Sequence, residues 1–335
     1  MKSERGEFSI INELFAPLAR NADGAFSLKD DVAQFDEGKI AVTKDLMIEG
    51  VHFRKQDPLN LVAQKLLRVN ISDLVAKGLR PKGYLLGCVW PTTIKTAQIK
   101  KFVEGLAHDQ DVFKCSLMGG DTTRHLAKGA PMMFSATFYG AIAQAGVVRR
   151  AGAKSGDDIY VSGTIGDSGL GLKVLEKDYK CAASEKEFLS KRYWLPEPRM
   201  VFGSALNSFA SAALDVSDGL LADAGHLAEN SNVEMVIELP LMPLSGAAEK
   251  FVETAADRNS ALQFLATCGD DFEILFTAPQ AMRRSVAMAA KASRTQITRI
   301  GKTRRGNGVT LINEQGEEES LADHDNNNGY DHFRD

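Results

Sequence analysis

Aspartates stand at the ends of apolar segments throughout this chain, and their placement constrains the fold more than any other feature. Most of these acids directly precede or follow a run of residues with the apolar pattern of a strand or a helix. A carboxylate beside buried structure is unfavourable unless it is paired or binds a cation. The sequence therefore predicts that acids far apart in the chain converge on shared divalent ions. The positions are Asp30, Asp31, Asp45, Asp73, Asp121, Asp215, Asp218, Asp270 and Asp271.

Asp73 is the most informative of these acids. The apolar residues after Asp57 repeat at helical spacing, and Asp73 falls on their stripe, where an apolar residue is expected. Asn70 lies one turn away on the same side. We expect Asp57 to be the N-cap of this helix, with Pro58 in its first turn and Gly78 just after its end. A polar residue on the buried face of a helix indicates a site.

The stretch from Leu117 to Thr123 reads Leu-Met-Gly-Gly-Asp-Thr-Thr. Residues 113–118 are predicted to form a strand that leads into a turn at Gly119 and Gly120. Paired glycines lack Cβ atoms, so a phosphate or a hydrated ion can approach the backbone closely. Asp121 then offers an oxygen ligand of the kind that a hard cation prefers. The alternative interpretation is a simple turn without a ligand.

A third acidic stretch follows the short apolar strand 212–216. Asp215, Ser217 and Asp218 are predicted to cluster at a strand-to-helix turn. Capping the helix requires only one of these side chains, so their number exceeds the structural need. The helix N-terminus also presents N–H groups that suit an anion.

With 335 residues, the chain is expected to form two domains. A Gly-, Lys- and Arg-rich stretch around Arg149 and Arg150 resembles a linker, so we place the boundary there and predict domains 1–147 and 148–335. Arg149 and Arg150 are either solvated on this loop or reach a nucleotide phosphate from it.

The composition disfavours several partners. The net charge of −4 gives no reason to expect nucleic acid or an anionic membrane as a partner. No apolar run is long enough to span a bilayer, and residues 1–7 lack the apolar core of a signal peptide. The four scattered cysteines and isolated histidines argue against a disulfide framework and a zinc site, and suit a reducing cytoplasm.

The chain has no Walker A loop, no Glu–His metal spacing and no Ser–His–Asp order. Single aspartates at strand ends and helix starts are typical of Mg²⁺ held between carboxylates and phosphates. Mg²⁺ aligns phosphates for in-line transfer without a covalent nucleophile from the protein. The residues alone thus predict a Mg²⁺-dependent α/β enzyme that handles a nucleotide or a phosphate.

Together these stretches resemble the thiamine-monophosphate kinase family of the aminoimidazole-ribotide-synthetase-like superfamily. The resemblance covers nearly the whole chain in the same order. Glu49-Gly50-Val51-His52-Phe53 and Tyr330-Asp331-His332-Phe333 favour this family over its relatives. The other matching stretches are Asp30-Asp31, Thr43-Lys44-Asp45, Asn70-Ile71-Ser72-Asp73-Leu74, Gly119-Gly120-Asp121-Thr122-Thr123, Arg150-Ala151-Gly152-Ala153, Gly163-Thr164-Ile165-Gly166-Asp167-Ser168 and Asp215-Val216-Ser217-Asp218-Gly219-Leu220.

The resemblance implies transfer of the γ-phosphoryl group of ATP to thiamine monophosphate, giving thiamine diphosphate and ADP. It implies an α/β fold in two domains. The N-terminal domain, which binds ATP and Mg²⁺, has a mixed sheet with helices, and this sheet pairs with its twin in a homodimer to form a barrel. The C-terminal α/β domain completes the active site.

The same resemblance assigns residues to roles. The catalytic set is Asp73, Asp121 and Asp218. The residues assigned to ATP binding are Gly120, Asp121, Arg150, Ser217 and Phe113. The residues assigned to the thiamine substrate are His52, Asp270 and Asn327. Several Mg²⁺ ions are assigned to Asp30, Asp31, Thr43, Lys44 (through its carbonyl), Asp45, Asp73, Asp121, Asp215 and Asp218.

Some positions depart from the family pattern. Lys29 and Lys44 stand where the family usually has Gly and often has Thr, and Asp270 replaces the usual Glu. Asn327 occupies a place where an aromatic residue often stacks on the substrate, a role that Tyr330 or Phe333 would have to take over.

Two alternatives to this function remain open. One is another ATP-dependent synthetase of the superfamily, although selenophosphate chemistry needs an early reactive cysteine and the first here, Cys88, lies in a predicted strand. The other is a protein that binds Mg²⁺ and nucleotide without catalysis.

Overall fold

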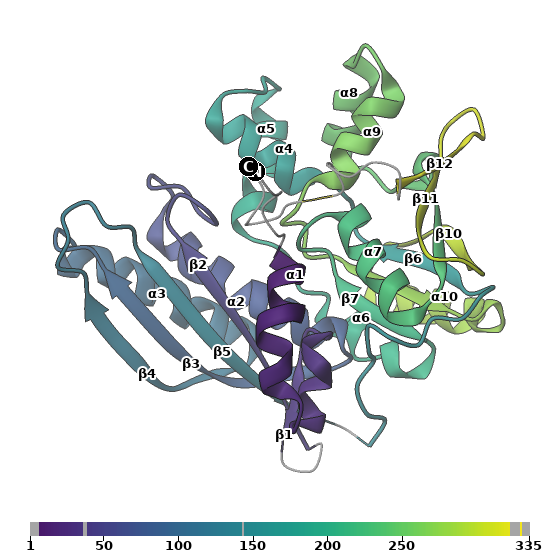
Figure 1. Cartoon of the computed structure of the whole chain (residues 1–335). Helices are drawn as coiled ribbons and strands as arrows, with labels where there is room; N and C mark the ends of the chain where they lie inside the picture. The colour runs from purple at the N-terminus through teal and green to yellow at the C-terminus, as the bar shows by residue number, and fades with distance from the viewer. Residues whose placement is uncertain (1–6, 36–38, 143, 322–328, 330–335) are drawn as a thin grey trace.

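The computed structural model describes residues 7–35, 39–142, 144–321 and 329, and its strands form two sheets flanked by helices (Figure 1). The helices are α1 (Glu7–Ile10), α2 (Leu59–Ala76), α3 (Thr96–Phe113), α4 (Asp167–Glu176), α5 (Ala183–Trp194), α6 (Met200–Gly203), α7 (Leu220–Ser231), α8 (Gly246–Thr254), α9 (Arg258–Thr267) and α10 (Arg283–Ser293). The strands are β1 (Ala33–Phe35), β2 (Ile40–Ile48), β3 (Arg80–Trp90), β4 (Ser116–Arg124), β5 (Met133–Ala141), β6 (Asp158–Ser162), β7 (Ala212–Asp215), β8 (Glu234–Glu238), β9 (Ile274–Ala278), β10 (Ile297–Arg304), β11 (Gly308–Ile312) and β12 (Glu318–Ser320).

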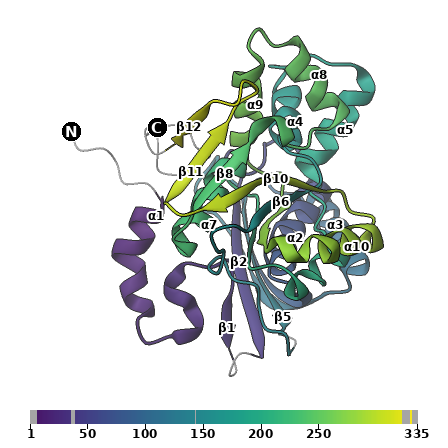
Figure 2. The same ribbon diagram turned by 90° about the vertical axis from the view of Figure 1, so that its right-hand side faces the viewer.

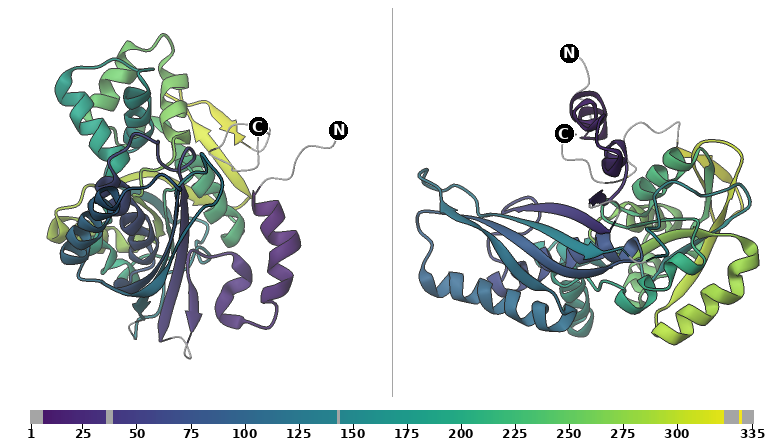
Figure 3. Two further views of the ribbon diagram at one scale, coloured as in Figure 1. Left: turned by 90° about the vertical axis from the view of Figure 1, so that its left-hand side faces the viewer. Right: turned by 90° about the horizontal axis from the view of Figure 1, so that it is seen from below.

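The N-terminal sheet has the strand order β1-β2-β5-β3-β4, in which β3 and β4 are parallel and the other neighbours antiparallel. Burial alternates along its central strand, where Phe134, Ala136 and Phe138 are buried and the residues between them are half-buried. This period of two assigns one face of the sheet to the core. Helix α3 runs along that face, and the α1 segment stands on the other side (Figure 3, right).

The second sheet has the order β12-β11-β8-β10-β6-β9-β7. Strands β8 and β11 are parallel, and the remaining neighbours are antiparallel. Helix α7 packs against β7, β8 and β11, and α4, α5, α8 and α9 gather at one end of the molecule (Figure 2). Together the two sheets confirm the α/β fold with a mixed N-terminal sheet that the sequence predicts.

One of the two hydrophobic clusters of the structure spans both sheets, and the other lies within the second half of the chain. Phe134 and Phe138 of the N-terminal sheet belong to the same buried cluster as Phe202 and Phe276 from the second half of the chain. Helix α2 contacts both β2 and β7, so it lies where the sheets meet. This position explains why Asp73, which α2 carries, faces residues from both halves.

The predicted boundary between residues 147 and 148 stays an expectation. The strands divide between the two sheets after Ala141 and before Asp158, so the predicted linker lies in the connection between the sheets. None of the helices in the described ranges is long and apolar enough to cross a membrane.

Helix α2 has the predicted extent, and Gly78 follows it with φ of 79°. The expectation that Asp57 caps this helix is wrong. Its carboxylate instead accepts hydrogen bonds from the Arg54 N–H at 2.8 Å and from Trp194 Nε1 at 2.9 Å, and Pro58 occupies the N-cap position. The Arg54 guanidinium also donates to this carboxylate at 2.6 Å, so Arg54 and Trp194 take the group that would otherwise cap the helix.

The apolar residues between Phe8 and Leu18 recur at the spacing of an amphipathic helix, but the segment does not form one regular helix. One α-helical turn is followed by a π-helical turn, Ile11–Phe15, and a 3-10 turn, Ala16–Ala19. Leu14 and Leu18 remain 59% and 82% exposed. Their helical spacing is therefore present, but the apolar stripe does not enter the core of this chain.

The Gly-Gly-Asp stretch is not a turn. It lies inside β4, which begins at Ser116, because α3 continues as far as Phe113. Gly120 pairs with Leu86, and a Cβ atom at Gly120 would overlap the Leu86 carbonyl oxygen. Its φ of 149° also favours glycine. The second glycine is thus required for close strand pairing.

Candidate active site

Four aspartates from separate parts of the chain converge where the two sheets meet. Asp45 lies on β2, Asp73 on α2, Asp215 at the end of β7, and Asp31 just before β1. Carboxylate oxygens of Asp31, Asp73 and Asp215 lie within 4.8 Å of one another. The Thr43 hydroxyl donates a hydrogen bond to Asp73 Oδ2 at 2.6 Å. The predicted convergence of these acids is therefore present in the fold.

Local periodicity explains how β2 contributes to this cluster. Side chains alternate along a strand, so Thr43 and Asp45 share the face toward α2, and Lys44 is exposed. On α2, Asn70 and Asp73 are three residues apart and therefore neighbours on the helix surface. Asn70 Oδ1 accepts the Asp45 N–H at 3.1 Å. This bond holds β2 against α2 at the height of the acids.

The cluster carries strong mutual repulsion. Burial, together with the carboxylates of Asp215 and Asp31, raises the pKa of Asp45 to about 7. Burial and the Asp31 carboxylate raise the pKa of Asp215 to about 6. Burial and the neighbouring carboxylates also hold the pKa of Asp73 well above its ordinary value. For Asp45 and Asp215, burial and the like charges outweigh the lysine and arginine side chains that favour the charged forms.

The donor set fits Mg²⁺. Carboxylates and the Thr43 hydroxyl are hard oxygen ligands, which Mg²⁺ prefers. Within the described ranges, Oδ2 of Asp215 is buried and has no hydrogen-bond partner. A buried anionic oxygen of this kind is stabilised by a bound cation.

Asp30 and Asp31 also have basic partners that the sequence analysis did not identify. Lys77, whose side chain is 0% exposed, contacts both carboxylates. Asp31 also contacts Arg150, and Asp30 pairs with Arg149 Nε at 2.6 Å. Burial alone would raise the pKa of Asp31, but Arg150 and Lys77 lower it. The structure therefore brings Asp31 to the acid cluster and uses Asp30 to hold Arg149.

The only local signal for Lys77 was its position just after α2, where basic side chains are common. Its Nζ atom also donates to the Ala213 carbonyl oxygen at 2.6 Å, a contact with β7 that sequence spacing does not reveal. For Arg150, the interpretation as a solvated loop residue is wrong, because its side chain is 16% exposed and paired with Asp31.

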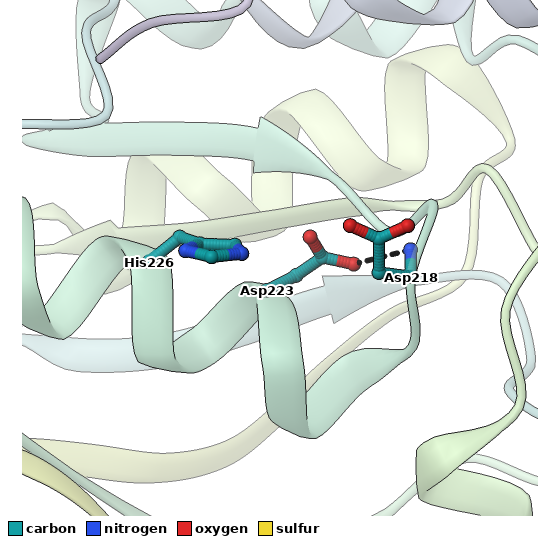
Figure 4. A group of neighbouring side chains, drawn as sticks. All are labelled: Asp218, Asp223 and His226. Atoms are coloured by element: carbon teal, nitrogen blue, oxygen red, sulfur yellow. Dashed lines mark hydrogen bonds between the residues drawn. The ribbon is translucent and has the colours of Figure 1, made fainter. Parts of the chain in front are cut away.

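The strand-to-helix turn after β7 carries Ser217 and Asp218. Their N–H groups donate to Oδ2 of Asp223 at 3.0 and 3.1 Å. A carboxylate of α7 thus takes the N–H groups of the turn, whereas the expectation that the N–H groups at the start of α7 itself suit an anion stays a prediction. Figure 4 shows Asp223 between Asp218 and His226, and ligand atoms of the three residues lie within 4.8 Å of one another.

Asp223 and His226 were not identified from the sequence, although their spacing of three residues on α7 puts them on one face. Burial and the nearby Arg150 charge lower the pKa of His226 to about 4, so its imidazole is neutral near pH 7. The ring also packs against that of Phe8, with a centroid distance of 3.9 Å and an angle of 37° between the planes.

A cavity of about 710 Å³ is lined both by members of the acid cluster and by the predicted substrate residues. It extends from the acid cluster to a second group of side chains contributed by the segment after β2 and the segment before β9. Among the predicted site residues, those that line it are Asp31, Thr43, Lys44, Asp45, His52, Asp73, Arg150, Ser217, Asp218 and Asp270.

The substrate end of the cavity is tied to the nucleotide end by the backbone. The Asp270 N–H donates to the Ser217 carbonyl oxygen at 2.8 Å. His52 Nδ1 accepts the Ile48 N–H at 3.1 Å, so the proton of the neutral ring lies on Nε2. The two residues assigned to the thiamine substrate both line this cavity.

Gly120 and Asp121 do not join the cluster within this chain. Asp45 pairs with Ala136, Ala136 pairs with Leu86, and Leu86 pairs with Gly120. Three strand spacings of about 4.8 Å put Gly120 roughly 14 Å from Asp45. Strand β4 is exposed along its whole length. The structure therefore separates Asp121 from the other predicted metal ligands of its own chain.

Phe113 is not among the residues that line this cavity. Phe113 is the last residue of α3, and its ring centroid is 5.4 Å from the Arg68 guanidinium carbon. Asn327 lies outside the described residues, as do Tyr330 and Phe333. The tail contributes Gly329 to the cavity lining.

Comparisons with known proteins extend over most of the chain. The family profile of AIR synthase related protein, N-terminal domain, matches residues 29–142. A thiamine-monophosphate kinase from Caulobacter vibrioides is 38% identical over 307 residues, which is 91% of this chain and 86% of the relative. The thiamine-monophosphate kinase of Escherichia coli K12 is 34% identical, and the match covers 98% of each chain.

Solved structures show the same likeness. A structure described as AaThiL complexed with AMPPCP and TMP superposes with a TM-score of 0.82 at 28% identity, covering 98% of this chain and 97% of the other. A thiamine-monophosphate kinase from Stenotrophomonas maltophilia K279a superposes with a TM-score of 0.75 at 33% identity, covering 91% of this chain and 97% of the other.

Proposed function

The chain belongs to the thiamine-monophosphate kinase family, and on this premise we propose that it transfers the γ-phosphoryl group of ATP to the phosphate of thiamine monophosphate. The products are thiamine diphosphate and ADP. One observation carries the proposal, namely the cavity that is lined by Asp31, Asp45, Asp73 and Arg150 together with His52 and Asp270. A relative complexed with both AMPPCP and TMP supports this pairing of ligands.

The two substrates repel each other because each carries phosphate charge. Mg²⁺ bound to the acid cluster would neutralise the phosphate oxygens and align them for in-line transfer. Asp45, Asp73 and Asp215 supply carboxylate ligands, and the Thr43 hydroxyl keeps Asp73 oriented through its 2.6 Å hydrogen bond. The acceptor is itself a phosphate anion, so positioning and charge cancellation outweigh general-base help.

Arg150 and Ser217 are the residues that we assign to the ATP phosphates. Arg150 lines the cavity beside Asp31, and its planar guanidinium suits phosphate oxygens. Because Asp223 takes the N–H of Ser217, the Ser217 side chain is the group that remains for the nucleotide. We retain Asp218 as a Mg²⁺ ligand, since it lines the same cavity.

Asp121 enters this scheme through a homodimer. The face of the N-terminal sheet that points away from α2 carries Ile40, Leu46 and Leu85, which are 38%, 41% and 46% exposed. An apolar face of this kind is suited to association with a second copy. In such a dimer, Gly120 and Asp121 of one copy complete the site of the other, which resolves their separation of roughly 14 Å from Asp45 in one chain.

The direct test incubates the protein with ATP, Mg²⁺ and thiamine monophosphate and measures thiamine diphosphate. We expect product, with one ADP formed for each thiamine diphosphate. Binding of both ligands without product would favour a non-catalytic binding protein. Release of ADP without thiamine diphosphate would favour another ATP-dependent enzyme of the superfamily.

A further inference from the structure

Lys65 is a buried cation at the substrate end of the cavity. It lies on α2, and its side chain is 3% exposed. Its Nζ atom donates to Asp270 Oδ2 at 2.7 Å and to the His52 carbonyl oxygen at 3.3 Å. The same atom lies 4.1 Å from the centroid of the Tyr193 ring. One ammonium group is thus held between both residues that we assign to the thiamine substrate.

The donors of Lys65 are fully used by these contacts. An ammonium group has three N–H donors and no acceptor. Two of them serve Asp270 and the His52 carbonyl, and the remaining positive edge faces the Tyr193 ring, whose π face attracts a cation. A lysine in this arrangement is a poor direct ligand for a phosphate, since it would have to leave three partners.

Asp270 is fixed from two sides. Its backbone adopts a left-handed conformation with φ of 68°, and its N–H is bonded to Ser217. Its Oδ2 atom is engaged by Lys65, while the side chain stays 38% exposed and lines the cavity. The carboxylate therefore presents its other edge to a ligand in one orientation.

We propose that Lys65 is a positioning residue, which holds the Asp270 carboxylate so that it accepts an N–H of the substrate's aminopyrimidine ring. This inference rests on the proposed function and deepens it at the thiamine end. An ionised carboxylate only accepts hydrogen bonds, and the amino group of the pyrimidine donates them. The positively charged thiazolium ring of the same substrate also favours an anion nearby. Lys65 thus acts on the thiamine portion, through Asp270, and leaves the phosphate to the other end of the cavity.

The test compares ligands that differ only in the phosphate. Lys65→Met keeps the apolar stem and removes the charge. We expect its affinity for thiamine monophosphate and for thiamine to fall by the same factor, about 10-fold to 100-fold, as for a lost hydrogen bond to a charged group. The affinity for ATP should not change. Lys65→Arg should recover part of the loss. Lys101→Met, a matched change at a side chain 64% exposed on α3, should leave all three affinities unaltered.

A double-mutant cycle identifies the route of the effect. In the Asp270→Asn background, Lys65→Met should add little, because the partner through which Lys65 acts has already lost its charge. Full additivity of the two changes would overturn the proposal. So would a loss for thiamine monophosphate with unchanged thiamine affinity, because Lys65 would then contact the phosphate directly.

Separate control experiments test whether the variants fold and whether the wild-type protein has the proposed activity. Circular dichroism and the melting temperature show whether each variant folds. If Lys65→Met does not fold, Asp270→Asn alone must weaken thiamine and thiamine monophosphate equally, and unchanged thiamine affinity there would refute the proposal. A wild-type protein that forms no thiamine diphosphate would refute the proposed function instead, whereas normal substrate affinity in Lys65→Met with an active wild type would refute the role of Lys65.

Discussion

The hydroxyl group of Thr43 donates a hydrogen bond of 2.6 Å to Oδ2 of Asp73, and this bond joins β2 to α2 at the centre of the acid cluster. It fixes the orientation of a carboxylate whose pKa burial and the neighbouring acids hold well above the ordinary value. An oriented, uncompensated carboxylate is the form in which a protein presents a ligand to a divalent cation.

Loss of this ligand should therefore reduce catalysis more than folding. We expect Asp73→Asn to lower the rate of thiamine diphosphate formation by at least ~100-fold, as the loss of a metal ligand does. Initial rates at saturating ATP and thiamine monophosphate measure the effect, and Glu104→Gln on the exposed surface of α3 is the control. Near-normal turnover in Asp73→Asn would remove that residue from the metal site.

Asp121→Asn should lower the rate of thiamine diphosphate formation by a similar factor, at least ~100-fold. In this case the affected site is the one in the partner copy. Mixing Asp121→Asn with Asp73→Asn provides the critical measurement. In a mixed dimer one site has both aspartates and the other has neither, so random pairing should restore about one quarter of the wild-type activity. No recovery after subunit exchange, checked with differently tagged copies, would mean that Asp121 does not act across the dimer.

The acid cluster also predicts how stability depends on pH without Mg²⁺. Burial and the Asp215 and Asp31 carboxylates raise the pKa of Asp45 from its ordinary 3.8 to about 7, so the folded chain binds this proton more tightly than the unfolded chain does. The contribution of Asp45 to stability is thus greatest at acidic pH, falls as pH rises from about 4 to about 7, and then levels off.

Mg²⁺ should reverse this loss, because it binds the ionised carboxylates of the folded state. Melting temperatures measured at pH 5 and pH 8, with EDTA or with MgCl₂, test the expectation. The rise caused by Mg²⁺ should be larger at pH 8, and Asp45→Asn should reduce the difference. An equal rise at both pH values would contradict the assignment of these acids to a metal.

Lys77 should matter mainly for stability. Its side chain is fully buried and contacts Asp30, Asp31 and the Ala213 carbonyl oxygen. Lys77→Met would leave two buried carboxylates with fewer cations, and breaking a buried pair in this way destabilises by about 3–5 kcal/mol. Urea denaturation measures the change in the free energy of unfolding, with Lys101→Met as the exposed control. A change below about 1 kcal/mol, the range of surface pairs, would contradict the structural role of Lys77.

The sequence by itself determined the parts of this protein that depend on local pattern. Helical spacing predicted α2 and identified Asp73 as an acid on its apolar stripe. Asp45 was predicted at the end of an apolar strand, whereas β2 continues beyond it to Ile48. These patterns predicted the fold class and the core of the acid cluster, because each requires only neighbours a few residues apart. The order of the motifs also pointed to the family.

Only the tertiary structure decided which charges meet. Lys65 and Asp270 are 205 residues apart, and Lys77 reaches Ala213 over a separation of 136 residues. The tertiary structure also places Asp121 on an exposed strand, away from the acids that share its predicted role. The physical reason is that local periodicity fixes the face of an element on which a side chain lies, whereas its partners depend on how elements pack. Packing is settled by the buried surface of the whole chain.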